Sequence, residues 1–522
     1  MNPVQYTTTA IVYPNSRVHV GWGWECLGAD WRNRVASALG METYFATGMD
    51  EHSLNVQRAA EAKGLTPQVY CDQMSEDIQK VLGQMKLSYD RFIRTSDADH
   101  HRVVEQLIQK SFAKGDIYPA KYEGQYCDGC EVYYTEKDLV NGVCPQHKTP
   151  TRFVSEENFF FKLTKYKDAL LKLLEDNPDF IRPAFRKGEV LTFIKEVKDF
   201  SVSRSTFTWG IPLPFDRKQV IYVWFDALIN YLTAAGIEAK LKDPGSSGAR
   251  EFDARWANVL HVIGKDISRF HCVFWPAMLM SMELPMPKGV FIHGFINMKG
   301  EKMSKSLGNY VTPDEVIGAV GVDAFRYYLL AENQFSNDGN FEWEALYLKC
   351  NADLANDWGN LVNRTISMAR KYFPEGGLKP GTAAVSAGVR ESFARLVPEL
   401  RKRWDEMDPS GYITLCRERS RVLNLFIDQT KPWALAKQTT PEAKAELAEV
   451  LATVLEGIRW IATAFLPVLP EGMPKVFEQL GVPVPVEKSA LVRLEWGAYA
   501  YSPNAPSPIY PRLELAKESP QA

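Results

Sequence analysis

The sequence lacks an apolar segment long enough to cross a lipid bilayer. Its most apolar stretch, residues 272–280, is about half as long as the roughly 18 to 20 residues that a spanning helix needs. The first residues also lack a basic segment followed by an apolar run, which is the pattern of a secretory signal. We therefore expect a soluble, cytoplasmic protein with no membrane partner.

Cysteine is scarce, with 8 in 522 residues, and most cysteines are scattered. Scattered cysteines in a large chain are usually reduced core residues, so we do not expect a disulfide framework. An excess of positive charge is also missing, because the formal net charge is -3. Any nucleic acid must therefore bind to a local basic surface, since the whole molecule has no cationic field.

Internal repeats and low-complexity tracts are absent as well, which argues against a fibrous or disordered chain. The composition, with 45% hydrophobic and 24% charged residues, is that of packed globular cores. A chain of 522 residues exceeds the size at which one core stops growing. We expect two to four structural units.

The beginning of the chain has the pattern of a strand, a helix and a second strand. Residues 6–13 are rich in β-branched and aromatic side chains and run into a turn at 14–17. A helical pattern covers 20–39, and 42–48 looks like a strand that ends at Gly48. This order predicts a βαβ unit with a parallel sheet.

Farther along the chain, the pattern is mostly helical over 54–114 and is then interrupted by a segment with cysteines, glycines and aromatics at 127–147. We interpret this interruption as an insertion. Apolar runs that would complete the sheet follow at 220–225, 259–263 and 290–293. From 323 to 480 almost everything has helical periodicity, which predicts a helix bundle.

One short loop carries strong chemical information: Lys302-Met303-Ser304-Lys305-Ser306, just after Gly300. Two lysines and two hydroxyls can surround a polyphosphate, because attack on the α-phosphate of a nucleotide builds negative charge on the pyrophosphate. An arbitrary pair of lysines at this spacing would more often be a solvated basic loop. The match over five residues favours phosphate binding.

This loop resembles one of the two signatures of class I aminoacyl-tRNA synthetases. The other signature, His-Ile-Gly-His, corresponds here to His19-Val20-Gly21-Trp22, where a helix N-terminus offers NH groups and a positive dipole end to phosphates. Trp22 replaces the second histidine, and an indole donates one hydrogen bond but cannot carry charge. The resemblance implies that ATP and Mg²⁺ bind here and that adenylation is retained but slowed. It assigns catalysis to His19, Gly21, Lys302 and Lys305, and ATP binding to His19, Gly21, Trp22, Lys302, Met303, Ser304, Lys305 and Ser306.

Within class I, nearly the whole chain is similar to methionyl-tRNA synthetases. Residues 47–52, Thr-Gly-Met-Asp-Glu-His, resemble that family's Thr-Gly-Thr-Asp-Glu-His. The resemblance implies that Asp50 binds the α-amino group of methionine, and a carboxylate at the carboxyl end of a strand suits a cationic group. An aromatic, uncharged pocket suits a polarizable thioether, although each aromatic alone would more often be core. The implied pocket residues are Ile11, Tyr13, Trp224, Ala227, Leu228, Tyr231, His271 and Trp275.

Two pairs of potential metal ligands lie in the insertion: Cys127 with Cys130, and Cys144 with His147. Each pair has two intervening residues, and a short loop separates the pairs, which is typical of a tetrahedral structural zinc site. Four protein ligands leave no open position, so we expect Zn²⁺ to brace the insertion without doing chemistry. The similar family usually has a cysteine in place of His147.

In the helical half, Asn360 and Arg364 are four residues apart and share one helix face, while Trp433 lies at the start of another helix. In the similar family such positions read the methionine anticodon by stacking and base-edge contacts, the usual mode for single-stranded RNA. The alternative is ordinary packing for Trp433 and a surface pair for the other two.

The expected architecture is α/β: a doubly wound, Rossmann-type parallel sheet with a zinc-bearing insertion and a C-terminal helical bundle. The domain limits are 1–116 and 219–322 for the two halves of the catalytic domain, 117–218 for the insertion, 323–480 for the anticodon-binding bundle and 481–522 for the tail. The partners are methionine, ATP and tRNA(Met). We expect a monomer, because no basic β-rich module follows the bundle.

Two other functions are compatible with the sequence. The first is a paralogue without aminoacylation activity that acts as a tRNA-binding or regulatory protein, which the tryptophan at position 22 suggests. The second is a related synthetase for another apolar amino acid, which the anticodon residues and the zinc spacing disfavour. Methionine-dependent exchange of pyrophosphate into ATP distinguishes all three.

Overall fold

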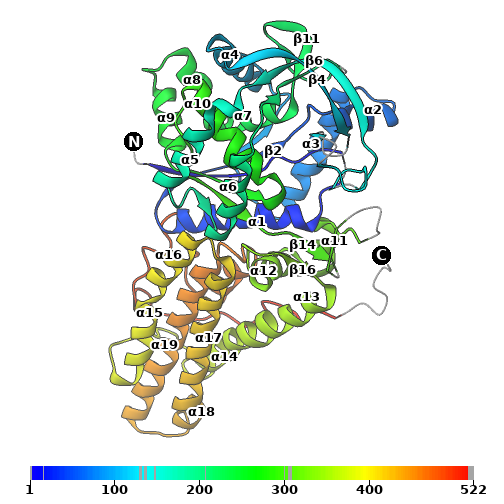
Figure 1. Cartoon of the computed structure of the whole chain (residues 1–522). Coiled ribbons are helices and arrows are strands. Elements are labelled where there is room, and N and C mark those ends of the chain that lie inside the picture. The colour runs from blue at the N-terminus through cyan, green and yellow to red at the C-terminus, as the bar shows by residue number, and fades with distance from the viewer. Residues whose placement is uncertain are drawn as a thin grey trace. The chain divides into compact units, whose positions relative to one another are not determined.

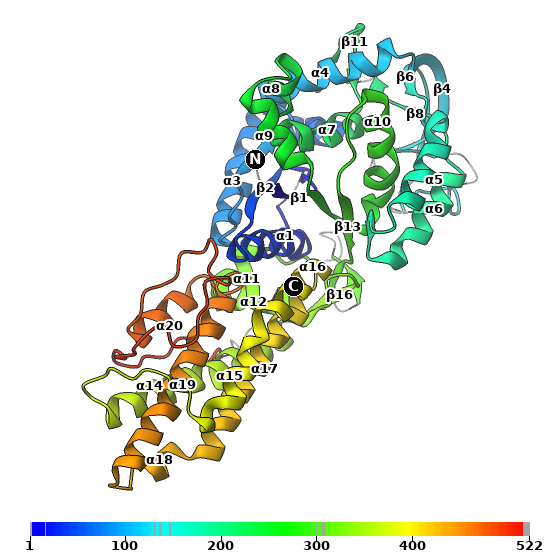
Figure 2. The same cartoon turned by 90° about the vertical axis from the view of Figure 1, so that its left-hand side faces the viewer.

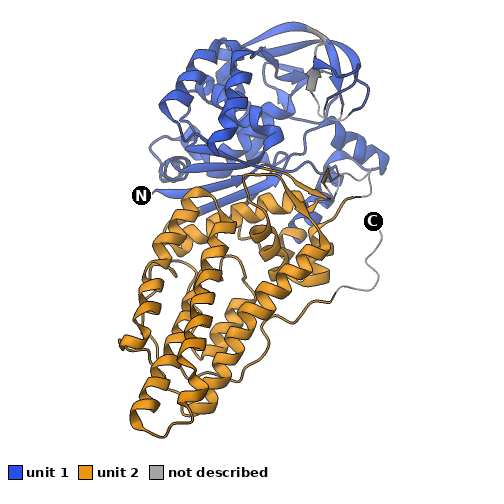
Figure 3. Ribbon diagram, turned by 60° about the horizontal axis from the view of Figure 1, so that its bottom comes forward, with its two compact units in different colours: residues 1–17, 44–80, 89–293 blue, residues 18–43, 81–88, 294–522 orange. Residues whose placement is uncertain are grey.

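The computed structural model describes residues 3–15, 17–128, 132–134, 138–145, 148–205, 207–298, 300–303 and 309–514. The chain divides into two compact units (Figure 3). Unit 1 comprises residues 1–17, 44–80 and 89–293, and unit 2 comprises residues 18–43, 81–88 and 294–522. Each unit is therefore assembled from segments that are far apart in the sequence.

Unit 1 is built on a six-stranded sheet with the order β3-β2-β1-β12-β13-β7. Its registers are parallel, for example Tyr6 opposite Val259 and His261 opposite Val290. The strand order reverses between β1 and β12, so the topological switch point of a doubly wound fold lies there, outside the carboxyl ends of the strands. The predicted parallel, doubly wound sheet is confirmed. Its strands are β1 Val4–Thr9, β2 Glu42–Met49, β3 Arg91–Arg94, β7 Ile181–Arg182, β12 Val259–Gly264 and β13 Gly289–His293.

The central strands form because both of their faces are covered. Every residue of β12 and of β13 is buried, which is typical of parallel strands between helical layers. Helices of unit 1 contribute apolar side chains to the same core as these strands, and Figure 2 shows α7, α9 and α10 around the strands. Among these helices are α4 Ala98–Ala113, α7 Val223–Ala235, α9 Ser247–Trp256 and α10 Trp275–Met282.

The prediction of a sheet strand at residues 220–225 was wrong. β11, Asp216–Ile221, pairs antiparallel with β9, Ser203–Arg204, and β10, Pro212–Leu213, in a separate small sheet. Helix α7 already begins at Val223. Nearly all of α7 is buried, so its apolar residues show no helical alternation, and such a run cannot be distinguished from a strand by periodicity.

The predicted insertion contains a second, antiparallel sheet with the order β5-β4-β6-β8. Its centre is a long ribbon in which β4 and β6 pair from Ile117 opposite Phe161 to Tyr126 opposite Arg152. The cysteine-bearing segment follows the far end of this ribbon. The strands are β4 Ile117–Cys127, β5 Val132–Tyr134, β6 Arg152–Phe161 and β8 Phe200–Ser201.

Unit 2 contains α1, Val20–Ala38, and the predicted helix bundle, and both predictions are confirmed. The long helices α14, α17 and α19 run side by side (Figure 1). The sequence analysis did not predict three short strands of unit 2, which are β14 Ile296–Met298, β15 Glu301–Lys302 and β16 Gly339–Phe341. None of the described helices is long and apolar enough to span a membrane. The bundle helices are α12 Val322–Glu332, α13 Trp343–Cys350, α14 Asn360–Tyr372, α15 Ala387–Ala394, α16 Leu396–Glu406, α17 Pro409–Thr430, α18 Pro432–Leu435, α19 Pro441–Phe465 and α20 Gly472–Leu480.

Candidate active site

One face of α7 in unit 1 carries four of the residues expected to bind the methionine side chain. Trp224, Ala227, Leu228 and Tyr231 follow the spacing i, i+3, i+4 and i+7, which places them along one side of a helix. Trp224 is partly exposed, whereas the other three are buried. The sequence spacing therefore produces a continuous apolar and aromatic surface.

Two further pocket residues, His271 and Trp275, meet this face through Tyr231. The Tyr231 hydroxyl lies 2.7 Å from His271 Nε2, and the rings of Tyr231 and Trp275 make an edge contact at 6.2 Å. His271 lies in the first half of a π-turn, and Trp275, one helical turn later, is the first residue of α10. The structure thus brings Tyr231 together with His271 and Trp275, a segment some 40 residues farther along the chain, in one aromatic cluster.

A second histidine, His261, lies in this cluster, and both its imidazole and that of His271 are neutral. Burial lowers the pKa of His271 to about 4 and lowers the pKa of His261 well below its usual value. His261 lies between Trp275, whose Nε1 is 3.3 Å from His261 Nε2, and Thr8, whose hydroxyl is 2.8 Å from His261 Nδ1. An uncharged aromatic surface of this kind accommodates a thioether and disfavours a charged side chain.

Sequence reasoning missed two members of the cluster. Phe270 stacks on Trp224 with 3.6 Å between ring centroids, and His261 orients Trp275. A signal for His261 was present, because it is the only polar side chain in the otherwise apolar strand β12. Phe270 had no comparable signal, since a phenylalanine in an apolar run is usually core.

The carboxyl end of β2 carries Asp50, which is only 3% exposed. The backbone NH of Asp50 donates to the carbonyl of Val12, and the Val12 NH donates to Gly48. The predicted pocket residues Ile11 and Tyr13 flank Val12, so these bonds fix them beside Asp50. A side chain at Gly48 would collide with the carbonyl of Ile93 at 2.0 Å, which explains the glycine before this carboxylate.

In unit 2, His19 caps the N-terminus of α1. Its Nδ1 accepts the backbone NH groups of Gly21 at 3.0 Å and Trp22 at 3.4 Å, so the neutral ring carries its proton on Nε2. A Cβ at position 21 would lie 2.8 Å from the His19 ring. Gly21 is therefore required by the histidine cap, in addition to the close approach of a nucleotide that we predicted.

The lysine loop of unit 2 begins in a hairpin. β14 and β15 pair antiparallel, with Asn297 opposite Lys302, and Gly300 takes the positive φ of 79° that the turn requires. Met303 is buried, whereas Ser304, Lys305 and Ser306 and the side chain of Lys302 lie outside the described residues. After the loop, the carbonyl of Val311 accepts the NH of Val20. This bond attaches the chain that follows the loop to the start of α1.

Comparisons with known proteins agree with this arrangement. The family described as "tRNA synthetases class I (M)" matches residues 5–153 and 146–366. The methionine--tRNA ligase of Fusobacterium nucleatum is 40% identical over 98% of this chain and 80% of that protein, and that of Caldanaerobacter subterraneus is 43% identical over 92% and 74%. The chain belongs to the class I methionyl-tRNA synthetases. Among solved structures of such synthetases, the Mycobacterium tuberculosis enzyme in complex with methionyl-adenylate has a TM-score of 0.91 and 37% identity, covering 98% of this chain and 100% of the other.

This methionyl-tRNA synthetase departs from the class I signature at Trp22. The side chain is partly buried, and its Nε1 has no hydrogen-bond acceptor among the described residues. A buried donor that lacks a protein acceptor is costly unless water or a ligand satisfies it. The indole nitrogen is thus a candidate donor to a bound molecule.

The synthetase brings two of its four predicted zinc ligands into one small buried cluster. Cys127 and Cys144 are both fully buried and pack with Tyr134 and Leu139. Soft thiolates in a buried cluster are suitable donors for zinc. Cys130 and His147 lie outside the described residues, and the described part of the chain contains no group of three or more metal-ligating side chains.

Two of the three predicted anticodon residues of the synthetase lie on helix surfaces of unit 2. Trp433, on α18, is 43% exposed, and Asn360 at the start of α14 is exposed. Arg364 donates to Asn424 Oδ1 at 2.5 Å, which joins α14 to α17 near its end. Exposure of a tryptophan at the end of a bundle leaves an aromatic face available for stacking.

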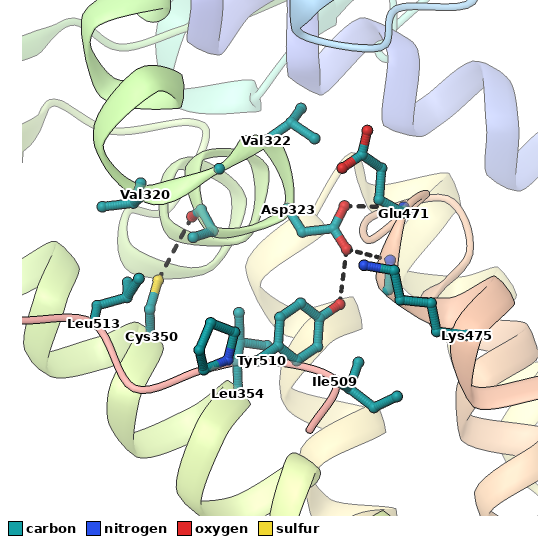
Figure 4. A pocket seen from close by; sticks show the side chains of 14 residues that line it. Val320, Val322, Asp323, Cys350, Leu354, Glu471, Lys475, Ile509, Tyr510 and Leu513 are labelled. Atoms are coloured by element: carbon teal, nitrogen blue, oxygen red, sulfur yellow. Dashed lines mark hydrogen bonds between the residues drawn. The ribbon is translucent and has the colours of Figure 1, made fainter. Parts of the chain in front are cut away.

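A cavity of about 140 Å³ also occurs in unit 2, at the start of α12 (Figure 4). The carboxylate of Asp323 accepts the NH groups of Glu471 and Gly472 and the hydroxyl of Tyr510. None of the predicted site residues is among the described residues that line it. The cavity is therefore separate from the residues assigned to methionine and ATP.

Proposed function

We propose that the chain ligates methionine to tRNA(Met) in two steps. The carboxylate of methionine attacks the α-phosphorus of ATP, which gives methionyl-adenylate and pyrophosphate. The 3′-terminal hydroxyl of the tRNA then attacks the carbonyl carbon of the adenylate, and AMP leaves. The observation that carries the proposal is the uncharged aromatic cluster around Tyr231, His271 and Trp275 in a chain of this family.

Residues of unit 1 bind the amino acid in this proposal. Asp50 accepts the α-ammonium group, and its burial strengthens an ion pair that water would otherwise screen. The thioether contacts the aromatic cluster, whose polarizable rings favour sulfur. The residues that surround methionine are Ile11, Tyr13, Trp224, Ala227, Leu228, Tyr231, His271 and Trp275.

Residues of unit 2 bind ATP. The start of α1, with His19, Gly21 and Trp22, supplies NH groups and a positive dipole end to the phosphates. The loop from Lys302 to Ser306 supplies positive charge as pyrophosphate leaves, and Mg²⁺ accompanies the phosphates. Catalysis is then positioning and electrostatics, so no covalent nucleophile is needed.

The remaining parts serve tRNA binding and stability. Asn360, Arg364 and Trp433 bind the anticodon, with the exposed indole stacking on a base. Cys127, Cys130, Cys144 and His147 hold a structural Zn²⁺, for which the shared burial of the two described cysteines is the support. The domain limits 1–116, 117–218, 219–322, 323–480 and 481–522, the monomeric state and a cytoplasmic location belong to the same proposal.

Methionine-dependent exchange of pyrophosphate into ATP tests the first step, and formation of methionyl-tRNA tests the second. Activity with methionine in both assays supports the proposal. Leucine- or isoleucine-dependent exchange would indicate a synthetase for another amino acid. Absence of exchange with retained tRNA binding would indicate the paralogue that only binds tRNA, an alternative that the relatives do not favour.

A further inference from the structure

Behind the methionine-binding face, α7 carries a second, polar face. Asp226, Asn230 and Thr233 follow the spacing i, i+4 and i+7 and are all buried, at 0%, 2% and 6% exposure. Asp226 is adjacent in sequence to Ala227, yet it lies on the opposite side of the helix from the pocket face. A buried carboxylate is costly unless hydrogen bonds or opposite charges compensate for the lost water. The groups that contact the Asp226 carboxylate therefore indicate its role.

Asp226 binds two histidines from different elements. One carboxylate oxygen lies 2.7 Å from His52 Nδ1, and the other lies 2.8 Å from His100 Nε2. Both imidazoles are almost fully buried. His100, on α4, also contacts the Thr233 hydroxyl at 3.0 Å, so it spans two turns of the polar face of α7.

The carboxylate remains ionised and fixes the direction of both hydrogen bonds. Burial raises the pKa of Asp226, but the nearby His52 and the hydrogen bonds from both imidazoles outweigh burial and hold the pKa well below its usual range. An ionised carboxylate only accepts. His52 must therefore donate through Nδ1 and His100 through Nε2, and charge-assisted hydrogen bonds of this kind are strong and directional.

His52 connects this cluster to the amino-acid site, because it follows Asp50 in the chain with only Glu51 between them. Glu51 is itself fixed, since its NH donates to Thr95, its carboxylate accepts Arg94, and its carbonyl accepts the Trp209 indole at 2.6 Å. The segment 50–52 is thus held on one side by these partners and on the other side by Asp226.

We infer that Asp226 is a positioning residue that, through His52, keeps the Asp50 carboxylate at a fixed place relative to the side-chain pocket on α7. One helix then presents the thioether surface on one face and anchors the ammonium-binding segment with the other. The inference rests on the proposed role of Asp50. The cluster of Asp226, His52 and His100 then sets the distance between Asp50, which binds the ammonium group, and the surface of α7 that binds the thioether. That distance has to match the length of one methionine.

A double-mutant cycle with Asp50→Asn and Asp226→Asn tests this inference on the full chain. Pyrophosphate exchange gives kcat and KM for methionine and for ATP. We expect Asp226→Asn to raise the KM for methionine about 10- to 100-fold, as misplacement of a binding group by roughly 1 Å does. The KM for ATP should stay the same. When Asp50→Asn is already present, adding Asp226→Asn should raise the KM for methionine by less than about 2-fold. The effects of residues that act through one another are not additive.

The matched control is Asp116→Asn. Asp116 is also a fully buried carboxylate of unit 1, but it binds Lys165, Tyr166 and Ser281. This variant should lower the melting temperature without changing the KM for methionine. Equal effects of Asp116→Asn and Asp226→Asn on that KM, or additive effects in the cycle, would overturn the inference. An unchanged KM in Asp50→Asn alone would instead overturn the proposed ammonium site.

A second pair of variants covers the case in which Asp226→Asn does not fold. His52→Asn retains a donor near the position of Nδ1, whereas His52→Leu removes it. The inference predicts that the asparagine variant keeps most of the methionine affinity and that the leucine variant loses it at unchanged KM for ATP. Equal methionine affinities in two folded variants would contradict it.

Discussion

The hydroxyl of Tyr231 and Nε2 of His271 lie 2.7 Å apart in the buried core of unit 1. The other ring nitrogen of His271 faces the carbonyl of Ile267 at 3.1 Å. A carbonyl only accepts, so Nδ1 carries the proton and Nε2 must accept from Tyr231. The chain of bonds from Ile267 to Tyr231 thereby fixes the orientation of the phenol on the proposed methionine-binding face of α7.

Replacing Tyr231 by phenylalanine should weaken methionine binding while the ring remains. The change removes the hydrogen bond to His271 that fixes the orientation of the ring. We expect the KM for methionine in pyrophosphate exchange to rise about 10-fold, because a binding group is no longer held in place, with an unchanged KM for ATP. Tyr44→Phe is the control, because the Tyr44 hydroxyl also donates to α7, at Ala234. A similar KM change in both variants would contradict the role of Tyr231.

The architecture was predictable where strands and helices have distinct patterns. The β-branched run before the first turn, the helix of α1 and the apolar strands β12 and β13 were all recognised from the sequence. The segment around Val223 was not, because a fully buried helix lacks a polar face and its apolar run resembles a strand. The edge strand β7 contains only two residues, and such a short element has no pattern of its own.

The candidate site divides along similar lines. Residues in dense motifs, such as Asp50 and Tyr231, could be selected from the sequence. The Asp226 cluster could not, because its partners His52 and His100 come from elements far apart in the chain, and only the fold brings them together. A polar residue at 0% exposure in an apolar helix is recognisable as unusual only once its burial is known.

The indole of Trp22 should contribute a hydrogen bond to the reaction. Its Nε1 is buried without an acceptor among the described residues, and a donor near developing phosphate charge is worth about 10-fold or more in rate. We expect Trp22→Phe to lower kcat of pyrophosphate exchange by about 10-fold and Trp22→His to raise it, since an imidazolium can also carry charge. Initial rates at saturating methionine and ATP check this. Unchanged kcat in both variants would show that position 22 is only a packing residue.

Acid should destabilise the protein partly through His271. Its folded pKa of about 4 lies below the value of 6.5 for a free imidazole, so the unfolded chain binds a proton that the folded chain excludes between these two pH values. Stability is therefore complete above about pH 6.5 and falls toward about pH 4, by on the order of 3 kcal/mol. Urea unfolding at several pH values should show a smaller loss for His271→Gln, and equal losses would exclude His271 as the cause.

Lys305 should act late in the first step, when negative charge builds on the departing pyrophosphate. Lys305→Ala removes that charge compensation, so we expect kcat of exchange to fall by about 100-fold or more. The KM for methionine should change little, because the lysine has no part in binding the amino acid. Lys349→Ala is a suitable comparison, since Lys349 pairs with Glu332 on the bundle helices and should leave exchange unaffected. If Lys305→Ala lowers kcat and the affinity for methionine by the same factor, Lys305 does not act specifically on the departing pyrophosphate.

Trp433 should matter for tRNA and be irrelevant to adenylation. The indole is 43% exposed on α18, and stacking of one base on an aromatic ring is worth about 1 to 3 kcal/mol. Trp433→Ala should therefore raise the KM for tRNA about 5- to 100-fold in the aminoacylation assay and leave pyrophosphate exchange unchanged. Leu348→Ala provides the control, because Leu348 is another exposed apolar residue of unit 2, at 63%, without an assigned RNA contact. If both variants bind tRNA as the unmodified chain does, the exposed tryptophan does not stack on a base, and the end of the bundle is not the anticodon surface.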